Sequence, residues 1–223
     1  MWWWRRWRRS ICRRSSKTPK LEGASIYEQI HNLTTALSDK GVLSDPSVVD
    51  ALIDLAQQLG DEDYGAALLG EVCVALVGCR QFEKAEKTAR LIKGQERSEH
   101  LRMIAEAAKK IGETGQAREW LGEALEAAFI YRFPTQQAQC IAAVAATLES
   151  LDQDAASEAW QRAVQIAAPA QDAGGTDGSE ASGVLLDAVE GLLRLAHREE
   201  ARKVAEQIKL LSLRERAMAV VIR

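Results

Sequence analysis

The 223-residue sequence lacks several features that define common protein classes. No apolar run approaches the roughly 18–20 residues that a membrane-spanning helix needs, so the body is not expected to cross a bilayer. The four cysteines have neither the CxxC spacing of a metal or redox site nor the density of a secreted disulfide scaffold. A reducing compartment is therefore expected, with Cys73 and Cys140 acting as small hydrophobic side chains on apolar helix positions.

Aromatic residues are also scarce, at 5% of the chain, and four of the six tryptophans lie in the first seven residues. The folded part must therefore be built largely from Ala, Leu, Ile and Val, and small side chains of this kind favour close packing of helices. No alternating pattern of useful length indicates β-strands.

The sequence also lacks the common catalytic patterns. It has no Gly-x-Ser-x-Gly turn, no Cys/His nucleophile arrangement and no dinucleotide-binding fingerprint. The three histidines, His31, His100 and His197, fall in different predicted units, and none forms a recognisable metal-binding helix. We therefore expect them at the surface or at helix caps, and we predict a protein that is not an enzyme, with no cofactor and no metal site.

Acidic residues are absent from residues 1–20, which hold eight Arg and Lys residues. This leaves 21 bases against 32 acids, a net charge of −11, for residues 21–223. The tail is thus basic and the body acidic, and the charge of the body argues against nucleic acid as a partner because phosphate would be repelled.

The basic tail, residues 1–21, has an amphipathic pattern. On a helical projection Trp3, Trp4 and Trp7 share one side, and Arg5, Arg8 and Arg9 take the other. Trp favours the headgroup boundary and Arg attracts anionic lipid, so a membrane-surface tether is one interpretation. An organelle presequence, a nucleic-acid-binding arm and a disordered stretch without function remain open as alternatives.

The body, residues 22–223, repeats one helical signature. Ala85, Ala117, Ala156 and Ala201 each have an apolar residue four and seven positions later, and the intervals between them are 32, 39 and 45 residues. A second apolar segment precedes each alanine. Such a helix pair cannot bury its apolar face alone and must stack on its neighbours. The sequence therefore predicts an all-α fold, an α-α superhelix of antiparallel helix pairs.

Start and stop signals place the predicted helices. A first helix pair is expected over residues 25–60, with Asp45 as a cap and Pro46 at the first helical position of its second helix, and repeats begin at about residue 64. The expected pairs are 64–77 with 81–92, 98–111 with 115–131, 135–151 with 153–167, and 183–195 with 198–211. Residues 169–183, rich in Gly, Asp and Ser, are predicted to be a flexible loop. The apolar residues Met218, Val220, Val221 and Ile222 lack the polar outer face of a capping helix, which suggests self-association through the C-terminal helix.

The units resemble tetratricopeptide repeats. The best match is Ala117, Leu121 and Ala124 in the second helix, preceded by Leu101, Ile104, Ala105 and Ala108 in the first. The resemblance covers about residues 64–223. The Trp, Gly and Tyr of the family pattern are missing, and a HEAT- or armadillo-like array stays an alternative.

The resemblance implies that the first helices line a concave groove that holds a peptide or an amphipathic helix of another protein. The groove residues transferred by position are Glu71, Val74 and Val77; Arg102, Glu106, Lys109 and Lys110; Ile141, Ala145 and Leu148; and Leu186, Glu190 and Leu193. These residues predict a largely apolar groove with one basic stripe. The predicted function is that of a cytoplasmic scaffold or adaptor, with a membrane-associated tether or an organelle-targeted protein as alternatives through the tail.

Overall fold

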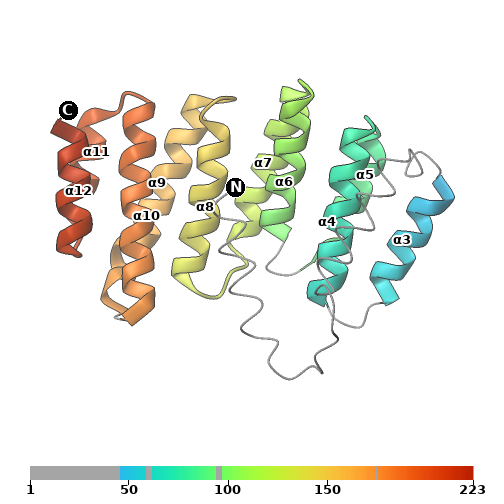
Figure 1. The fold of residues 1–223 in the computed structure, drawn as a ribbon, viewed down its shortest axis with the longest axis horizontal. Helices are drawn as coiled ribbons and strands as arrows, with labels where there is room; N and C mark the ends of the chain where they lie inside the picture. Colours follow the sequence, from blue (N-terminus) through green and yellow to red (C-terminus); the bar gives the residue numbers. More distant parts are fainter. Residues whose placement is uncertain (1–45, 59–61, 94–96, 174, 223) are drawn as a thin grey trace, which may run out of the picture.

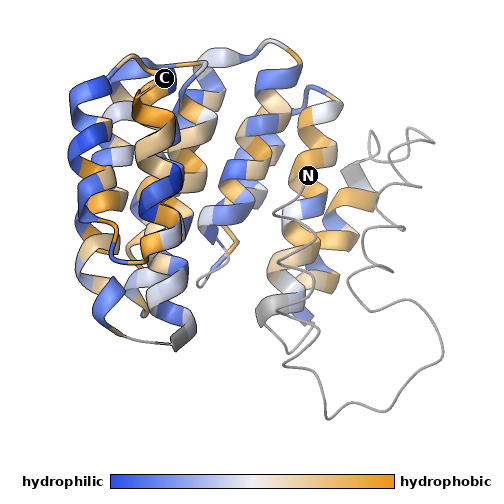
Figure 2. Cartoon of the chain, turned by 60° about the vertical axis from the view of Figure 1, so that its left-hand side comes forward, coloured by the Kyte–Doolittle hydropathy of each residue, from blue (hydrophilic) through white to orange (hydrophobic). Residues whose placement is uncertain are grey.

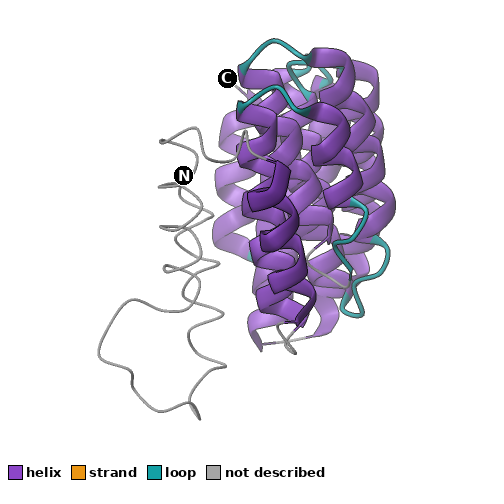
Figure 3. Cartoon of the chain, turned by 90° about the vertical axis from the view of Figure 1, so that its right-hand side faces the viewer, coloured by secondary structure: helices purple, strands orange, loops and turns teal. Residues whose placement is uncertain are grey.

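The computed structural model describes residues 46–58, 62–93, 97–173 and 175–222, which form α-helices and one 3-10 helix and contain no strand. The all-α prediction is confirmed, and the connectors lie at the ends of the helices (Figure 3). None of the described helices is both long enough and apolar enough to cross a membrane. The elements are α3 Pro46–Gln58, α4 Glu62–Gly78, α5 Phe82–Ala89, α6 Arg97–Lys110, α7 Thr114–Ala128, α8 Pro134–Leu148, α9 Gln153–Ala170, η2 Gln171–Ala173, α10 Gly175–Arg194, α11 Arg198–Gln207 and α12 Leu211–Ile222.

The helices form pairs that stack in sequence order (Figure 1). The pairs are α4/α5, α6/α7, α8/α9 and α10/α11, and they match the four pairs predicted from the sequence. The first helices pack against one another in the order α4, α6, α8, α10, followed by α12, and α7 and α9 also pack against the first helix of the next pair. The result is an all-α superhelical arrangement in which each pair contacts chiefly the pairs before and after it.

The alanines of the repeated signature are the points at which helices approach closely. Ala85, Ala117, Ala156 and Ala201 are all completely buried, each in the second helix of its pair. Methyl side chains let two helix backbones approach without a void, and apolar residues of the neighbouring first helix fill the remaining space. The prediction that these positions form the seams between helices is confirmed.

The turn within three of the four pairs has the same backbone conformation. Arg80, Gly112 and Ala196 have φ angles of 60°, 88° and 63°, and each lies five residues before a seam alanine. The next residue donates its backbone N–H to a carbonyl five residues earlier, at 2.9, 3.0 and 2.8 Å. This is the bond that closes a helix ending in a left-handed residue. The units therefore repeat in backbone geometry as well as in sequence.

The turn between α8 and α9 is built differently. Asp152 has extended backbone angles, and its side chain accepts a hydrogen bond from the N–H of Ala155 at 3.0 Å. This is an ordinary N-cap, in which the carboxylate satisfies a free N–H group at the start of the helix. A side-chain cap thus takes the place of the left-handed residue in the third pair.

The prediction of a flexible loop over residues 169–183 is wrong. α9 continues to Ala170, η2 covers Gln171–Ala173 and α10 begins at Gly175. The cause is Gln171, a buried side chain whose amide donates to the carbonyls of Ala168 and Gln207 and accepts from Ser182 Oγ and Lys209 N, at 2.8–3.2 Å. These bonds fix the connector against α10 and the segment before α12.

The described array begins with α3 and ends with α12. α3 begins at Pro46 as predicted, whereas residues 25–45, which were to supply its partner helix, lie outside the described residues. At the other end, α12 buries Ala217 and Val221 while Ile222 is 77% exposed. In Figure 2 the last turn of α12, beside the C-terminus, is visibly hydrophobic.

Candidate functional site: the face of the first helices

The predicted groove residues that remain accessible lie on α4, α6 and α10. We call the side of the first helices α4, α6, α8 and α10 that is turned away from their second helices the first-helix face. Its predicted members are partly or largely exposed: Glu71 and Val74 on α4, Arg102, Glu106, Lys109 and Lys110 on α6, and Glu190 and Leu193 on α10. Of these helices, α4 packs on α6, whereas α8 lies between α6 and α10.

Five other predicted groove residues do not fit that role because they are buried. Val77, Ile141 and Ala145 have no exposed surface, and Leu148 and Leu186 are 3% and 5% exposed. Each first helix touches its own second helix and also the first helices on both sides, which covers these side chains. A partner could not contact them without separating the helices. The accessible face is therefore mainly polar and charged, and the predicted apolar groove is corrected accordingly.

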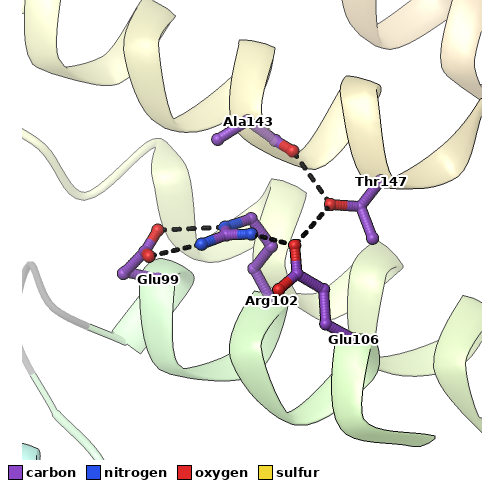
Figure 4. A network of polar contacts seen from close by, with 5 residues as sticks. All are labelled: Glu99, Arg102, Glu106, Ala143 and Thr147. Carbon is purple, nitrogen blue, oxygen red and sulfur yellow. Dashed lines mark hydrogen bonds and ion pairs between the residues drawn. The ribbon is translucent and has the colours of Figure 1, made fainter. Parts of the chain in front are cut away.

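A charged cluster occupies this face between α6 and α8 (Figure 4). Arg102 donates from Nε to Glu99 Oε2 at 3.1 Å and from an Nη to Glu99 Oε1 at 2.5 Å, and its other Nη binds Glu106 Oε1. Thr147 on α8 donates to Glu106 at 3.4 Å and lies 3.1 Å from the carbonyl oxygen of Ala143. The side chains of Arg102 and Glu99 are only 15% and 11% exposed.

The carboxylates around Arg102 stabilise its positively charged form. Burial on its own lowers the pKa of the guanidinium, but the hydrogen bonds and charges of Glu99 and Glu106 outweigh burial, so the pKa lies above its ordinary value. A planar guanidinium that binds two carboxylates is held in one orientation. The cluster has one base and two carboxylates, which gives this part of the face a net negative charge.

Polar bonds also join the first helices farther along the array. Gln139 on α8 donates to Glu180 on α10 at 3.1 Å, and Arg216 on α12 binds Glu190 on α10 at 3.1 Å. At the end of α8, Glu149 accepts two hydrogen bonds from Arg194 of α10, at 2.7 and 2.9 Å. The face is thus crossed by side-chain bonds that fix the spacing of α8, α10 and α12.

The Glu149 carboxylate reaches the second-helix layer as well. It accepts a third hydrogen bond from Nε1 of Trp160 on α9 at 3.0 Å. The indole of Trp160 lies against Gly191 of α10, where an added Cβ would come within 2.3 Å of the ring. One carboxylate therefore ties together three helices of two neighbouring pairs.

His100 is a correction to the expectation of a surface or cap role. It is 4% exposed, and neither ring nitrogen has a hydrogen-bond partner. Its ring packs on Gly70 of α4, where a Cβ would lie 2.2 Å from Nδ1. Burial lowers the pKa of His100 to about 4, against an opposing effect of the Glu99 charge. His197, by contrast, occupies the N-cap position of α11 as expected, and His31 lies outside the described residues.

Sequence reasoning missed several residues of this face. Glu99 lies three positions before the predicted Arg102, and Thr147 and Glu149 adjoin the predicted Leu148, but the positions transferred from the repeat pattern did not include them. The signal for Glu99 was available, since Glu99, Arg102 and Glu106 follow the i, i+3 and i+4 spacing of helical ion pairs. The contacts that these residues make with side chains of other helices could not be predicted from the spacing of residues within one helix.

Other predicted sites contribute nothing to this face. The described residues contain no group of three His, Cys, Asp or Glu side chains able to hold a metal ion. Cys73 and Cys140 form no disulfide and are buried as predicted, and burial raises the pKa of the Cys73 thiol above its ordinary value. The predicted membrane-binding residues Trp3, Trp4, Trp7, Arg5, Arg8 and Arg9 lie outside the described residues, so the tether stays a prediction.

Comparison with known proteins adds little to this description. No family model matches the chain, and no curated protein matches it. Among solved structures, the chain is similar to Ton1535 from Thermococcus onnurineus NA1, with 14% sequence identity and a TM-score of 0.40 over 90% of this chain and 83% of that one.

Proposed function

We propose that this chain is a tetratricopeptide-like scaffold that binds a segment of another protein on its first-helix face. The observation that carries the proposal is the set of accessible side chains on α4, α6 and α10: α4 packs on α6, and α8, whose predicted groove residues are buried, lies between α6 and α10. A partner laid across these side chains would contact several repeat units at once. Stacked helical repeats commonly present such a surface.

The charges on the face suggest how a partner would be held. The Glu99, Arg102 and Glu106 cluster is negative and conformationally fixed, whereas Lys109 and Lys110 at the end of α6 provide positive charge nearby. A partner with charges of both signs would match this pattern, and charge matching of this kind selects partner and register. The proposed setting is the cytoplasm, in keeping with the absence of a disulfide among the described cysteines.

The test is affinity capture with the full chain as bait, comparing two sets of variants. Val74→Glu, Leu193→Glu and Lys110→Glu change partly or largely exposed side chains of the first-helix face. Arg118→Glu and Arg162→Glu change exposed residues on the second helices α7 and α9 and serve as controls. We expect the first set to lose specific partners that the second set retains, with thermal melts confirming that all variants fold. Equal capture by both sets would show that the first-helix face is not the binding surface.

A further inference from the structure

The exposed large hydrophobic side chains of the described residues are concentrated in the connectors between helix pairs. Six of the eight lie there or at the adjoining helix end: Leu91 after α5, Phe129, Ile130 and Phe133 between α7 and α8, and Leu210 and Leu211 at the start of α12. The other two are Leu55 on α3 and Ile222 at the end of α12. Single exposed apolar side chains are common on protein surfaces, whereas a group of them marks an interaction surface.

These connectors lie at the same end of the array. Because the helices alternate in direction, the turns within pairs lie at one end of the helices and the connectors between pairs lie at the other, the lower end in Figure 1. We call this end the connector edge, defined by Arg90–Lys93, Phe129–Phe133 and Ile208–Leu211. The turns at the opposite end, around Arg80, Gly112, Asp152 and Ala196, expose no large hydrophobic side chain in the described part of the chain.

The Phe129–Phe133 turn is well ordered by its backbone. The N–H groups of Phe129, Ile130 and Tyr131 donate to carbonyls near the end of α7 at 3.2–3.3 Å, and the carbonyl of Phe133 accepts from Gln137 at 3.0 Å. Phe129, Ile130 and Phe133 are 52–57% exposed. Hydrogen bonds therefore fix the backbone of this turn while its three large apolar side chains stay exposed.

The charges in the three segments that define the connector edge all have one sign, whereas the connector between α9 and α10 at the same end carries the acidic Asp172. The segments Arg90–Lys93, Phe129–Phe133 and Ile208–Leu211 contain Arg90, Lys93, Arg132 and Lys209 and no acidic residue. Arg90 and Lys209 pair with Glu86 and Asp172, and Lys93 and Arg132 are exposed. This local excess of base contrasts with the net charge of −11 for residues 21–223. The edge complements a negatively charged surface.

We propose that the connector edge docks on an anionic lipid membrane surface. Phe129, Ile130 and Phe133 enter the boundary between headgroups and acyl chains, and Arg132 and Lys93 lie at the level of the lipid phosphates. The apolar side chains stand on separate protruding connectors instead of lining a groove, and a flat, deformable surface can reach all of them at once. Docking in this way leaves the first-helix face free, so the proposal does not depend on the proposed scaffold function.

The experiment is co-sedimentation of the full chain with vesicles of phosphatidylcholine, with and without phosphatidylserine. We expect binding that requires phosphatidylserine, and a loss of about tenfold or more in affinity for the triple variant Phe129→Ser, Ile130→Ser, Phe133→Ser. Arg132→Glu weakens binding to phosphatidylserine vesicles in the same direction. Leu55→Ser, which removes an exposed leucine away from the edge, is the matched control and leaves binding unchanged.

The experiment needs a separate comparison for the tail, because residues 1–20 are also predicted to bind membranes. The triple connector variant is compared in the natural chain and in a chain carrying Trp3→Ser, Trp4→Ser and Trp7→Ser. A similar loss in both backgrounds supports the proposal. Failure of the natural chain to bind vesicles overturns it, as does binding that depends on the tail tryptophans alone. A connector variant that changes only self-association, measured by sedimentation equilibrium, assigns the edge to a protein contact and also overturns the proposal.

Discussion

Arg80 and Ala196 hold a backbone conformation that glycine adopts with less strain. Their φ angles are close to +60°, in the left-handed region, and Gly112 occupies the equivalent place in the second pair. A Cβ in this region crowds the following carbonyl, at a cost of roughly 1–2 kcal/mol. The repeated turn therefore tolerates different side chains, but only at a cost in stability that the surrounding hydrogen bonds offset.

Replacing these residues tests that cost. We expect Ala196→Gly to raise the free energy of unfolding by about 0.5–1 kcal/mol, because relief of the strained conformation exceeds the added entropy of the unfolded chain. Gly112→Ala should lower it by a similar amount. Urea unfolding followed by circular dichroism measures both. A destabilised Ala196→Gly would mean that the turn is not strained.

His100 predicts a pH dependence of stability. Its folded pKa is about 4, below the value of 6.5 in an unfolded chain, because burial disfavours the charged ring. The neutral ring is thus the stable form in the fold. Stability is fully present above pH 6.5 and falls as pH drops from 6.5 towards 4, where the unfolded chain binds a proton first. The slope is roughly 1.4 kcal/mol per pH unit.

The comparison is between the natural chain and His100→Leu, with urea unfolding measured at several pH values from 7 to 4. Both chains keep every carboxylate, so the acid titration common to both cancels in the difference. The natural chain should lose about 3 kcal/mol more than the variant over this range. Parallel pH profiles would show that the buried ring remains charged or is hydrated.

At the scale of elements, the connector between α9 and α10 is held in place by the hydrogen bonds of one side chain, although its sequence predicts a mobile loop. Gln171 joins the end of α9, the first half of α10 and the segment before α12 through four hydrogen bonds. The backbone of Gln171 also lies close to Gly178, where a Cβ would come within 2.6 Å of its carbonyl oxygen. A small residue at position 178 is therefore part of the same contact.

Truncation of this side chain should be costly. We expect Gln171→Ala to lower the free energy of unfolding by about 3 kcal/mol, because it leaves buried donors and acceptors without partners. Gln161→Ala, an exposed residue of α9 bound to Glu200, should change it by less than about 0.5 kcal/mol. Thermal and urea unfolding provide the measurement. Equal effects of the two changes would mean that water replaces the bonds of Gln171.

At the scale of the whole molecule, the sequence predicts what depends on local periodicity. The helix pairs and their seams follow from the spacing of Ala85, Ala117, Ala156 and Ala201, since a 3.6-residue period decides which side chains share a face. Contacts between distant segments are not encoded in spacing. The bonds of Gln171 come from residues up to 38 positions away, and they override the turn preference of the glycines that follow.

The candidate site was harder to predict for the same reason. Helical spacing places Ile141 and Ala145 on one side of a helix, but it does not reveal that α6 and α10 cover that side. The burial of His100 likewise depends on Gly70, a residue of another helix. Arg102 and Glu106 were placed on this face by the transferred repeat pattern, and both are partly exposed in the structure.

A stacked array should also unfold by parts, because each pair is stabilised mainly by its nearest neighbours. α3 packs on α4 at one end of the described array, whereas α8 has packed helices on both sides. Leu52→Ala in α3 and Ile141→Ala in α8 each remove a buried side chain and should each cost about 2–5 kcal/mol locally. Their effects should nevertheless spread over different lengths of the chain.

Native-state hydrogen exchange separates these outcomes. Leu52→Ala should speed exchange of amides in α3 and α4 and leave α8 to α11 as in the natural chain, because the distant pairs keep all their contacts. Ile141→Ala should speed exchange from α6 to α10, because loss of the middle pair removes a neighbour on both sides. If Leu52→Ala instead accelerates exchange evenly from α3 to α12, the chain unfolds as one cooperative bundle. A partner bound to the first-helix face would then stabilise the whole array instead of only the units that it touches.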